Sequence, residues 1–494
     1  MKKMKNNLQT PLLNNEWNGK IYINGWVKPG RGTEEILEKA TGISIGQTGI
    51  ASPEDISNAG AVARFAQKSW AKKSGAQRSD VLREFARLIH DYSDEIATYL
   101  VKETGSIMLK AKWEVQMASR EFSEAAALAT QPTGFLTSTL EPGFQSIARR
   151  IPMGVIGIIT PWNSPIILAA RAIAPALAMG NAVVLKPDVQ SPVSGGFIFA
   201  KLLELANLPE GLFHVLPGGP ETGEALVKEP TVDMVSFTGS TRAGKLVGAN
   251  ASGLLKRVAL ELGGDNPYIV LEDVDIEAAA SAGTWGSFFH QGQICLSIGR
   301  HLVHESIAEA YTEALVRKAQ ALIVGNPLDE KVQVGPVINE RQVLNVLRIL
   351  DDSVAQGAKI LTGGKRNNLF IEPTVVTNVL PGMPLFDEEI FGPIATITIF
   401  KNDEEAIELA NMTDYGLVSA VVSSNLVRAQ HIADNIRTGV VHINDQTVVH
   451  GIYGPIAGVG KSGNGFGHGT VSNADTFSEW QWITTHATIP NYPF

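Results

Sequence analysis

Cysteine is almost absent from this chain of 494 residues, which contains one, Cys295. A single cysteine cannot form an intramolecular disulfide, and it cannot supply the ligands of a cysteine-rich zinc site. Such sparse cysteine use is typical of a reducing compartment, so we expect a soluble, cytoplasmic protein. The ten histidines show no His-Glu-x-x-His or similar ligand spacing, and the sequence therefore predicts no metal site.

Long apolar runs and clusters of positive charge are also missing. The most apolar stretch, residues 151–180, is interrupted by Arg171 and by prolines such as Pro161 and Pro175, and is too broken to cross a bilayer. The basic N-terminal residues are followed by no apolar segment of the kind found in signal peptides. With a formal net charge of -9 and no run of lysine or arginine, the chain lacks the electrostatic footprint of nucleic-acid binding. We therefore expect no membrane and no nucleic-acid partner.

The sequence does have the composition of a large globular protein. Apolar residues make up 44% and charged residues 18% of a chain that is long enough for about two or three domains. Residues 52–130 have helical periodicity, with helix starts expected at Ser52 and Ser79. Residues 131–150 are rich in Pro, Gly, Thr and Ser and break this pattern, whereas residues 476–485 are aromatic and alternate like an edge strand.

Apolar strands and helices alternate over residues 151–262. This alternation predicts a doubly wound parallel sheet, because buried parallel strands are apolar on both faces and are joined by helices. The same mixture resumes after Leu262, which predicts a second α/β domain. In the first domain the expected strands are 155–160, 182–185, 212–216 and 234–237, and the expected helices are 165–179, 194–206, 221–227 and 241–249.

The lone cysteine is the first candidate for chemistry. A lone cysteine is more often an inert buried residue, and taken alone Cys295 favours that interpretation. It closely follows Gly292-Gln293, however, a pair that suggests a turn rather than the interior of a helix. A cysteine on a turn can act as a nucleophile if other groups activate it and stabilise the product of its attack.

Two residues elsewhere in the chain are suited to assist such a nucleophile. Glu261 lies between apolar segments, and although most glutamates are solvated, this setting favours a buried carboxyl with a raised pKa that acts as a base. Asn163 follows the expected strand 155–160, at the edge where open α/β sheets bind ligands. Its side-chain amide is a candidate donor to an oxyanion.

A nucleotide site is indicated by residues 237–245 (FTGSTRAGK), which follow an expected strand and open an expected helix. Backbone N–H groups at such a helix start can face a phosphate. Gly239, Gly244 and Lys245 also have the spacing of a P-loop, but Leu246 occupies the Ser/Thr position that binds Mg²⁺, which disfavours a nucleotide hydrolase. The dinucleotide fingerprint Gly-x-Gly-x-x-Gly is absent from the sequence.

Two further segments suit a nucleotide. Lys186 ends the expected strand 182–185, where a cation can meet a ribose or a phosphate, although a surface lysine explains it equally well. In the acidic segment 387–393, Glu389 is suited to bind a ribose diol and Phe391 to pack against a nicotinamide ring, although acidic segments are usually solvated faces.

Taken together, these segments resemble the aldehyde dehydrogenase family over essentially the whole chain. They occur in the family's order, and the step from Glu261 to Cys295 is 34 positions (295 − 261). The matching segments are 161–163, 186–187, 237–241, 261–264, 292–295, 389–393, and Asn444 ahead of 458–463.

The resemblance implies a reaction and a role for each candidate. The Cys295 thiolate attacks the aldehyde carbon, and the Asn163 amide stabilises the oxyanion. Hydride then leaves for nicotinamide, and Glu261 activates the water that hydrolyses the remaining thioester. CoA-acylating members generally lack this glutamate, so its presence favours release of a free acid.

The resemblance also implies a coenzyme site for NAD, with NADP left open. Lys186 is expected to contact the adenosine ribose, Ser240 the pyrophosphate, and Glu389 and Phe391 the nicotinamide riboside. Val189 stands where many NAD-preferring members carry a glutamate that binds the ribose diol, and Asp265 stands where many members have lysine. The full expected set is Ile159, Thr160, Pro161, Trp162, Lys186, Gly219, Phe237, Gly239, Ser240, Leu262, Glu389 and Phe391.

Family members have two α/β domains and a small oligomerisation arm. By resemblance, residues 1–130 and 151–262 form the coenzyme-binding domain and residues 263–470 the catalytic domain. Residues 131–150 and 471–494 form the β-structured arm, which accounts for the two segments with unusual composition. The implied assembly is a homodimer or a homotetramer.

Within the family, the sequence is most similar to benzaldehyde (aromatic aldehyde) dehydrogenases in segments 186–192, 289–295, 443–447 and 479–483. An aliphatic aldehyde or a semialdehyde remains an alternative substrate, and a P-loop-like nucleotide hydrolase or a non-catalytic binding protein remains an alternative function. The expected pocket residues, which are equally compatible with core packing, are Leu168, Arg171, Trp285, Phe288, Ile294 and Leu296.

Overall fold

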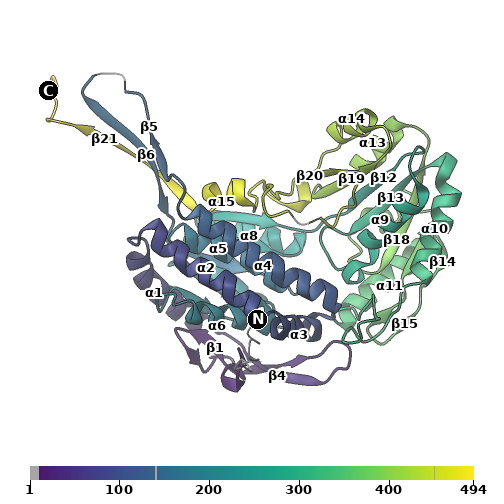
Figure 1. The fold of residues 1–494 in the computed structure, drawn as a ribbon, viewed down its shortest axis with the longest axis horizontal. Coiled ribbons are helices and arrows are strands. Elements are labelled where there is room, and N and C mark those ends of the chain that lie inside the picture. Colours follow the sequence, from purple (N-terminus) through teal and green to yellow (C-terminus); the bar gives the residue numbers. More distant parts are fainter. Residues whose placement is uncertain (1–10, 140–141, 450) are drawn as a thin grey trace, which may run out of the picture.

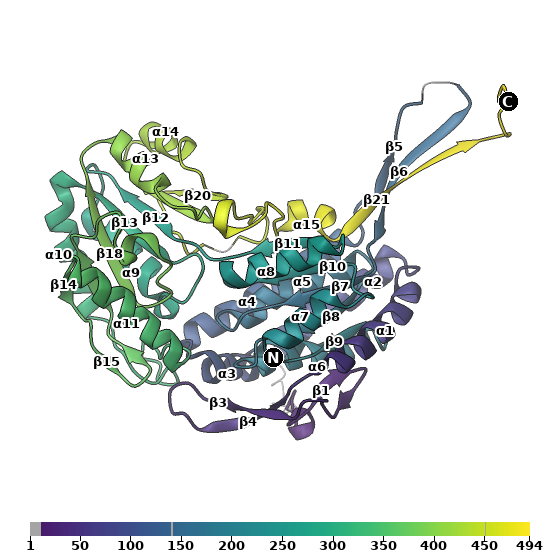
Figure 2. The same cartoon turned by 180° about the vertical axis from the view of Figure 1, so that it is seen from behind.

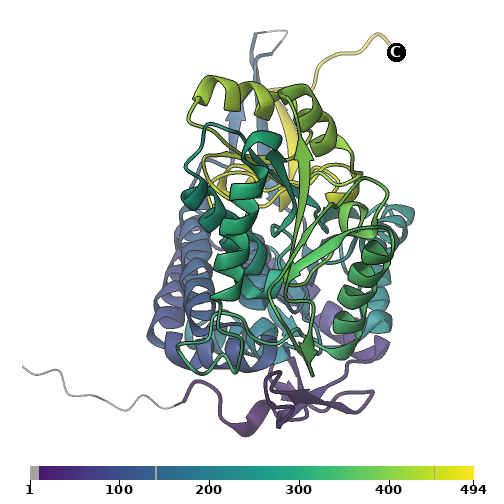
Figure 3. The same ribbon diagram turned by 90° about the vertical axis from the view of Figure 1, so that its right-hand side faces the viewer.

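The computed structural model describes residues 11–139, 142–449 and 451–494. Two lobes, each built on a seven-stranded sheet, lie side by side, and a narrow three-stranded sheet projects from the first lobe (Figure 1). Viewed from the right-hand side of Figure 1, the second lobe lies in front of the first (Figure 3). Within the described residues, no helix is both long and apolar enough to cross a membrane.

The sheet of the first lobe has the strand order β11-β10-β7-β8-β9-β1-β2. The strands from β11 to β9 are parallel, and β1 and β2 add to one edge in antiparallel orientation. The four predicted strands are confirmed within one residue at each end, because buried parallel strands are apolar along their whole length. The bounds are β1 (Ile21–Ile23), β2 (Trp26–Val27), β7 (Val155–Ile159), β8 (Ala182–Lys186), β9 (Phe213–Val215), β10 (Met234–Thr238) and β11 (Arg257–Glu261).

Helices cover both faces of this sheet. Helices α2, α4 and α5 lie over the face seen in Figure 1, and α1, α7 and α8 lie over the face seen in Figure 2. Each face therefore has its own hydrophobic core. The bounds are α1 (Pro53–Trp70), α2 (Gly75–Asp91), α3 (Ser93–Thr104), α4 (Met108–Leu128), α5 (Pro165–Ala178), α6 (Ile198–Leu205), α7 (Pro220–Lys228) and α8 (Thr241–Gly253).

Two helix starts differ from the predicted ones. Helix α2 begins at Gly75 rather than at Ser79, because the Ser74 hydroxyl accepts the N–H of Gln77 in a capping box. The predicted helix 194–206 begins as a π-helical turn, Val193–Phe197, that leads into α6.

The sheet of the second lobe has the order β14-β17-β18-β13-β12-β19-β20, and only its edge strand β14 is antiparallel to its neighbour. The second α/β unit predicted after Leu262 is therefore present. Its strands are β12 (Asn266–Val270), β13 (Ile298–His304), β14 (Lys359–Thr362), β17 (Thr374–Thr377), β18 (Ile394–Phe400), β19 (Val418–Val422) and β20 (Val440–Ile443). Its helices are α9 (Ile276–Phe288), α10 (Ala308–Gln320), α11 (Glu340–Ala355), α12 (Pro384–Asp387), α13 (Asp403–Asn411) and α14 (Leu426–Asp434).

The projecting sheet joins the two segments of unusual composition. After α15 (Thr470–Thr476), the strand predicted at the C-terminal end is confirmed as β21 (Ser478–His486). It pairs in antiparallel orientation with the whole of β6 (Phe144–Pro152), which also pairs with β5 (Gly134–Leu136). The remaining strands form two small ribbons, β3 (Thr33–Leu37) with β4 (Ser44–Gly49) and β15 (Arg366–Asn367) with β16 (Phe370–Ile371).

A buried ion pair connects α4 to the segment that precedes α5. Lys110 and Glu114 lie one helical turn apart on α4, and both side chains are fully buried. The Lys110 ammonium bonds to the Glu114 carboxylate, and its Nζ also donates to the backbone carbonyl of Asn163 at 2.8 Å. Because each buried charge compensates the other, the pair fixes the backbone at Asn163 without leaving an isolated charge in the core.

Substituting Lys110 by Met is expected to lower the free energy of unfolding by about 3–5 kcal/mol, because Glu114 loses its buried counter-charge. Chemical denaturation followed by tryptophan fluorescence measures the change. The double variant Lys110→Met/Glu114→Leu removes both charges and is expected to regain most of the lost stability. A single variant as stable as the unmodified protein contradicts this role of the pair.

Candidate active site

The carboxyl ends of the parallel strands in the first sheet converge on one edge. Lys186 is the last residue of β8 and pairs in register with Ile159 of β7. Thr238 is the last residue of β10 and pairs with Glu261, the last residue of β11. Open α/β sheets bind ligands at this edge, so the fold brings three predicted site residues, Ile159, Lys186 and Glu261, to the same edge of the sheet.

Asn163 lies between β7 and α5, next to the segment that carries Cys295. Its side chain is buried, and Nδ2 donates to the backbone carbonyl of Gln293 at 2.9 Å. A side-chain amide has two N–H donors, so this bond orients the group and leaves one donor available. The Lys110 bond to the backbone carbonyl of Asn163 fixes the residue from the other side.

The segment that leads to Cys295 has an unusual backbone. His290, Gln291 and Gly292 have successive positive φ angles of 52°, 57° and 68°. Non-glycine residues in this region are strained and persist only where the surroundings hold them. The Gln291 side chain supplies that restraint, because its Nε2 donates to backbone carbonyls of two distant segments at 2.9 and 2.7 Å. This turn after α9 directs the chain back toward the edge of the first sheet.

Cys295 is a free, half-buried thiol. Its pKa is raised to about 12, chiefly by burial; the Arg171 guanidinium opposes this rise, whereas the nearby carboxyls of Glu389 and Glu261 contribute to it. A thiolate at this position therefore depends on neighbouring positive charge.

Glu261 is a buried carboxyl with only 3% of its surface exposed. Burial raises its pKa to about 8, while the Arg171 guanidinium and the backbone of Gly458 lower it. The pKa of Glu261 is thus raised, as its position between apolar segments of the sequence predicts. Its Oε1 has no hydrogen-bond partner, so an acceptor with a pKa near neutrality is available for proton transfer.

Glu389 and Phe391, the residues predicted to contact the nicotinamide riboside, lie near the Cys295 segment. Glu389 Oε1 accepts the backbone N–H of Gly264 at 3.0 Å, and burial raises the pKa of this carboxyl to about 7. Phe391, at φ 52°, packs edge-on against Trp162 with ring centroids 5.6 Å apart. Glu389, Phe391 and Ile294 line a small cavity of about 20 Å³.

The residues predicted to hold a nucleotide lie along the same sheet edge. Ser240 is exposed at the start of α8, and an added Cβ at Gly219, just before α7, would meet no atom within 4 Å. The Thr160 hydroxyl is buried without a hydrogen-bond partner, and burial lowers the pKa of Lys186. The other predicted members lie at or just beyond the carboxyl ends of β7, β10 and β11, with Phe237 as the next-to-last residue of β10, and are Ile159, Pro161, Trp162, Phe237, Gly239 and Leu262.

The predicted pocket residues separate into different environments. Leu168 packs with Trp113 on α4, and Ile294 forms a small apolar cluster to which Leu296 is added. Phe288, by contrast, lies in one of the two hydrophobic cores of the second lobe, which favours a packing role over contact with a substrate. Trp285 is 43% exposed and stacks on a neighbouring ring at 4.3 Å.

Sequence reasoning missed two groups at this site. His468 is buried, and burial together with the Arg171 guanidinium lowers its pKa to about 3. It belongs to no recognisable motif. The Lys110–Glu114 pair has the spacing of an ordinary surface ion pair on a helix, so the sequence gives no signal that it is buried. In the described part of the chain, no three His, Cys, Asp or Glu side chains are grouped to hold a metal.

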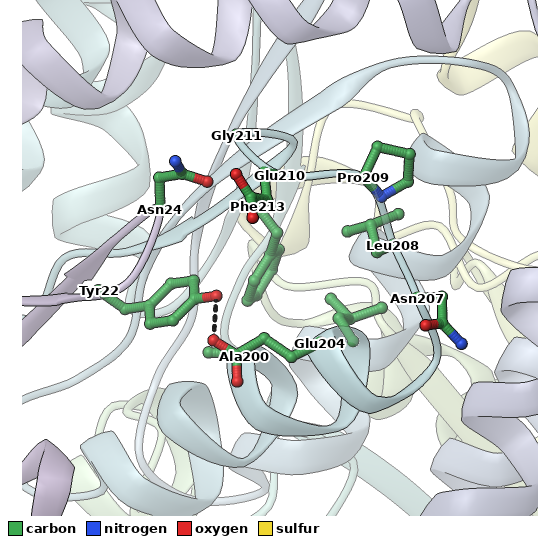
Figure 4. Close-up of a pocket in the computed structure, with 11 residues that line it drawn as sticks. Tyr22, Asn24, Ala200, Glu204, Asn207, Leu208, Pro209, Glu210, Gly211 and Phe213 are labelled. Atoms are coloured by element: carbon green, nitrogen blue, oxygen red, sulfur yellow. Dashed lines mark hydrogen bonds between the residues drawn. The ribbon is translucent and has the colours of Figure 1, made fainter.

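A larger surface pocket of about 440 Å³ lies at the opposite edge of the first sheet, between β1 and the segment after α6 (Figure 4). Tyr22 donates its hydroxyl to Glu204 Oε1 there at 2.7 Å. Its lining contains no cysteine and no cation, so the thiol site remains the stronger candidate for chemistry.

Comparison with known proteins places this geometry in a family. The family model described as "Aldehyde dehydrogenase family" matches residues 26–483. The chain is 42% identical to a benzaldehyde dehydrogenase [NAD(+)] of Pseudomonas putida, covering 97% of this chain and 98% of that protein. It is 44% identical to a vanillin dehydrogenase of an Amycolatopsis species, covering 98% and 99%.

Solved structures lead to the same family. A crystal structure of betaine aldehyde dehydrogenase from Staphylococcus aureus in complex with NAD⁺ superposes with a TM-score of 0.93 at 32% identity, covering 97% of this chain and 96% of that one. The predicted aldehyde dehydrogenase fold is thereby confirmed. The chain belongs to the aldehyde dehydrogenase family.

Proposed function

We propose that this enzyme oxidises an aromatic aldehyde to the carboxylic acid with NAD⁺ as hydride acceptor, in the reducing cytoplasm that its single cysteine suits. The observation that carries the proposal is the meeting of a free thiol, a buried carboxyl of raised pKa and an oriented amide at one sheet edge. The names of the benzaldehyde and vanillin dehydrogenase relatives support the aromatic substrate class.

Cys295 and Asn163 perform the first half of the reaction. The Cys295 thiol releases its proton to solvent, the thiolate sulfur forms a bond to the aldehyde carbon, and the carbonyl oxygen becomes an oxyanion. The free N–H of the Asn163 amide donates to that oxyanion, and its bond to the Gln293 carbonyl keeps the donor in place. Bound NAD⁺ supplies the acceptor for the hydride that leaves this carbon, so that a thioester remains on Cys295.

Glu261 performs the second half. Its carboxylate removes a proton from water, and the hydroxide adds to the thioester carbon. The C–S bond then breaks, which releases the acid and restores the thiol. The overall conversion is aldehyde, NAD⁺ and water to carboxylic acid, NADH and a proton. The presence of this base favours hydrolysis over transfer of the acyl group to CoA.

The coenzyme site proposed here fits the residues present. The exposed start of α8 at Ser240 and the open space at Gly219 suit a pyrophosphate, and Lys186 and the unpartnered Thr160 hydroxyl suit polar groups of the nucleotide. Glu389 with its neighbour Phe391 suits the nicotinamide riboside. We propose residues 1–130 and 151–262 as the coenzyme-binding domain and residues 263–470 as the catalytic domain, which carries the nucleophile and also contributes Glu389 and Phe391 to the coenzyme site.

A substrate comparison tests the proposed chemistry. Ring aldehydes such as benzaldehyde and vanillin are expected to give kcat/KM values at least about tenfold above those of short aliphatic aldehydes, because the proposed pocket residues Leu168 and Ile294 belong to apolar clusters that favour an apolar ring. Turnover with NAD⁺ and NADP⁺ is measured separately from the absorbance of the reduced coenzyme. Because Val189 carries no carboxylate to repel a 2′-phosphate, turnover with NADP⁺ is expected as well. Preference for aliphatic aldehydes contradicts the substrate class.

Two variants separate the proposed roles of Cys295 and Glu261. Cys295→Ala is expected to abolish NADH formation, including the first turnover. Glu261→Gln is expected to keep the initial burst of NADH and to slow steady turnover by about 10²- to 10⁴-fold, because only hydrolysis needs the base. In the unmodified enzyme, steady turnover should rise with pH through about 8, since the base acts only when ionised. Loss of the burst in Glu261→Gln argues against the role of a base.

We also propose that the sheet of β5, β6 and β21 is an oligomerisation arm, formed from residues 131–150 and 471–494, that joins copies into a homodimer or a homotetramer. This sheet projects from the first lobe (Figure 1). It exposes several large apolar side chains, which soluble proteins usually cover: Phe135 (57%), Leu136 (78%), Trp480 (49%) and Trp482 (72%).

A charge on this sheet tests the assembly. Trp482→Glu is expected to lower the mass in solution toward that of one chain, because a carboxylate in an apolar contact loses its hydration. Light scattering coupled to size exclusion measures the mass. Phe65→Glu is the matched control, since Phe65 is an aromatic side chain 82% exposed on α1. Equal masses for the Trp482 variant and the unmodified protein exclude the arm as the joining surface.

A further inference from the structure

Arg171 is the one ionisable residue on α5, and its position is unusual. All fourteen residues of α5 are buried, and the rest of its sequence is apolar. The Arg171 side chain is only 4% exposed. Removing a guanidinium from water is unfavourable unless hydrogen bonds and opposite charges compensate it, so a buried arginine on an apolar helix requires partners.

The guanidinium reaches from α5 to the edge of the sheet where the reaction takes place. Its Nη2 donates to the Thr238 hydroxyl at 3.3 Å, and Thr238 is the register partner of Glu261 in the neighbouring strand. Side chains of paired residues in parallel strands lie on the same face, so this bond places the cation beside the Glu261 carboxyl. Arg171 Nε and Glu261 Oε1 are both buried and both without a hydrogen-bond partner.

Titratable groups from several elements face this cation. Glu261 is the last residue of β11, Cys295 lies on the turn after α9, and His468 precedes α15. The positive charge of Arg171 lowers the pKa of each of these three groups. Glu389 faces the thiol with the opposite effect and raises the pKa of Cys295. Because the pKa of His468 lies at about 3, that ring is neutral and adds no second cation.

We propose that Arg171 is a positioning residue whose buried guanidinium favours the charged form first of the Cys295 thiol and then of the Glu261 carboxyl. The inference rests on the roles proposed above for these two residues. One cation suffices because the two anions are needed at different stages. The thiolate loses its charge when it bonds to the aldehyde carbon, and the carboxylate is required only afterwards, for hydrolysis.

The pH dependence of charge-altered variants tests this role. Arg171→Gln keeps a hydrogen-bond donor for Thr238 without the charge, and Arg171→Met removes both. In each variant, the acid limb of the pH profile, where the steady-state rate rises with pH, is expected to move to higher pH by about one unit. The pKa of Glu261 rises because this base loses its counter-charge. Arg171→Lys keeps the charge and is expected to keep the limb close to that of the unmodified enzyme.

The single cysteine provides a second measurement that does not need turnover. Alkylation of Cys295 by the neutral reagent iodoacetamide, followed by intact mass at one pH, is expected to be about tenfold slower in Arg171→Gln than in Arg171→Lys. If no aldehyde is oxidised, the proposed function fails, but this difference in thiol reactivity still decides the role of Arg171.

A matched control separates charge from structural support of α5. Arg78 donates from Nε to the carbonyl of Ala178 at the far end of α5, at 2.8 Å. Arg78→Met is expected to lower the melting temperature without moving the acid limb or the alkylation rate. The proposal is overturned if Arg171→Gln and Arg171→Lys share the profile of the unmodified enzyme. It is also overturned if the acid limb shifts equally in Arg171→Gln and Arg171→Lys, or if the only change in these variants is a higher KM for ring-substituted aldehydes.

Discussion

Desolvation of two acids at one point is the constraint on which the site depends. Burial, partial for the Cys295 residue and nearly complete for Glu261, raises the pKa of the thiol to about 12 and that of the carboxyl to about 8. A dry environment strengthens every hydrogen bond to the reacting atoms, yet it disfavours the thiolate and the carboxylate that the chemistry requires. The surrounding structure must therefore bring donors and a counter-charge into the site without admitting solvent.

The two lobes meet this requirement together. The first lobe provides Asn163 and Glu261 at strand ends, and the second provides Cys295 on a strained turn. Hydrogen bonds between the lobes fix their relative position. Asn163 Nδ2 donates to the Gln293 carbonyl, and Gln291 Nε2 donates to the carbonyl of Gly105, which follows α3. The strain in the turn is tolerated because these partners over-determine its conformation. The thiol is thus positioned by backbone geometry rather than by its own contacts.

Much of the fold could be predicted from the sequence because its signals are local. Buried parallel strands are continuous apolar runs, so the sequence predicts the ends of four of them, β7, β8, β9 and β10, within one residue, and the aromatic alternation identifies β21. Helix starts are harder to predict, because Ser79 has a side chain suited to an N-cap, yet Ser74 is the residue that forms the capping box. Phe288 shows what local sequence cannot distinguish: a buried aromatic residue beside a motif is equally compatible with the core and with a substrate pocket.

The charges inside the site could not be predicted, because they depend on contacts between distant segments. Nothing in the spacing of Lys110 and Glu114 distinguishes a buried pair from a solvated one. Arg171 stood out as a cation in an apolar helix, but its proximity to Glu261 arises only when α5 packs on the sheet beside β10.

The balance of charges at the site constrains the order in which its acids ionise. Two acids, Cys295 and Glu261, face a single guanidinium, a third acid, Glu389, faces the thiol, and the neighbouring His468 is neutral. Ionising one acid leaves the group of charges balanced, whereas ionising a second creates net negative charge in a medium of low dielectric constant. The acids therefore compete for the same cation, and the site favours their ionisation in sequence over their ionisation together. Formation of a covalent bond at Cys295 removes one competitor, which releases the cation for Glu261 at the stage when a base is needed.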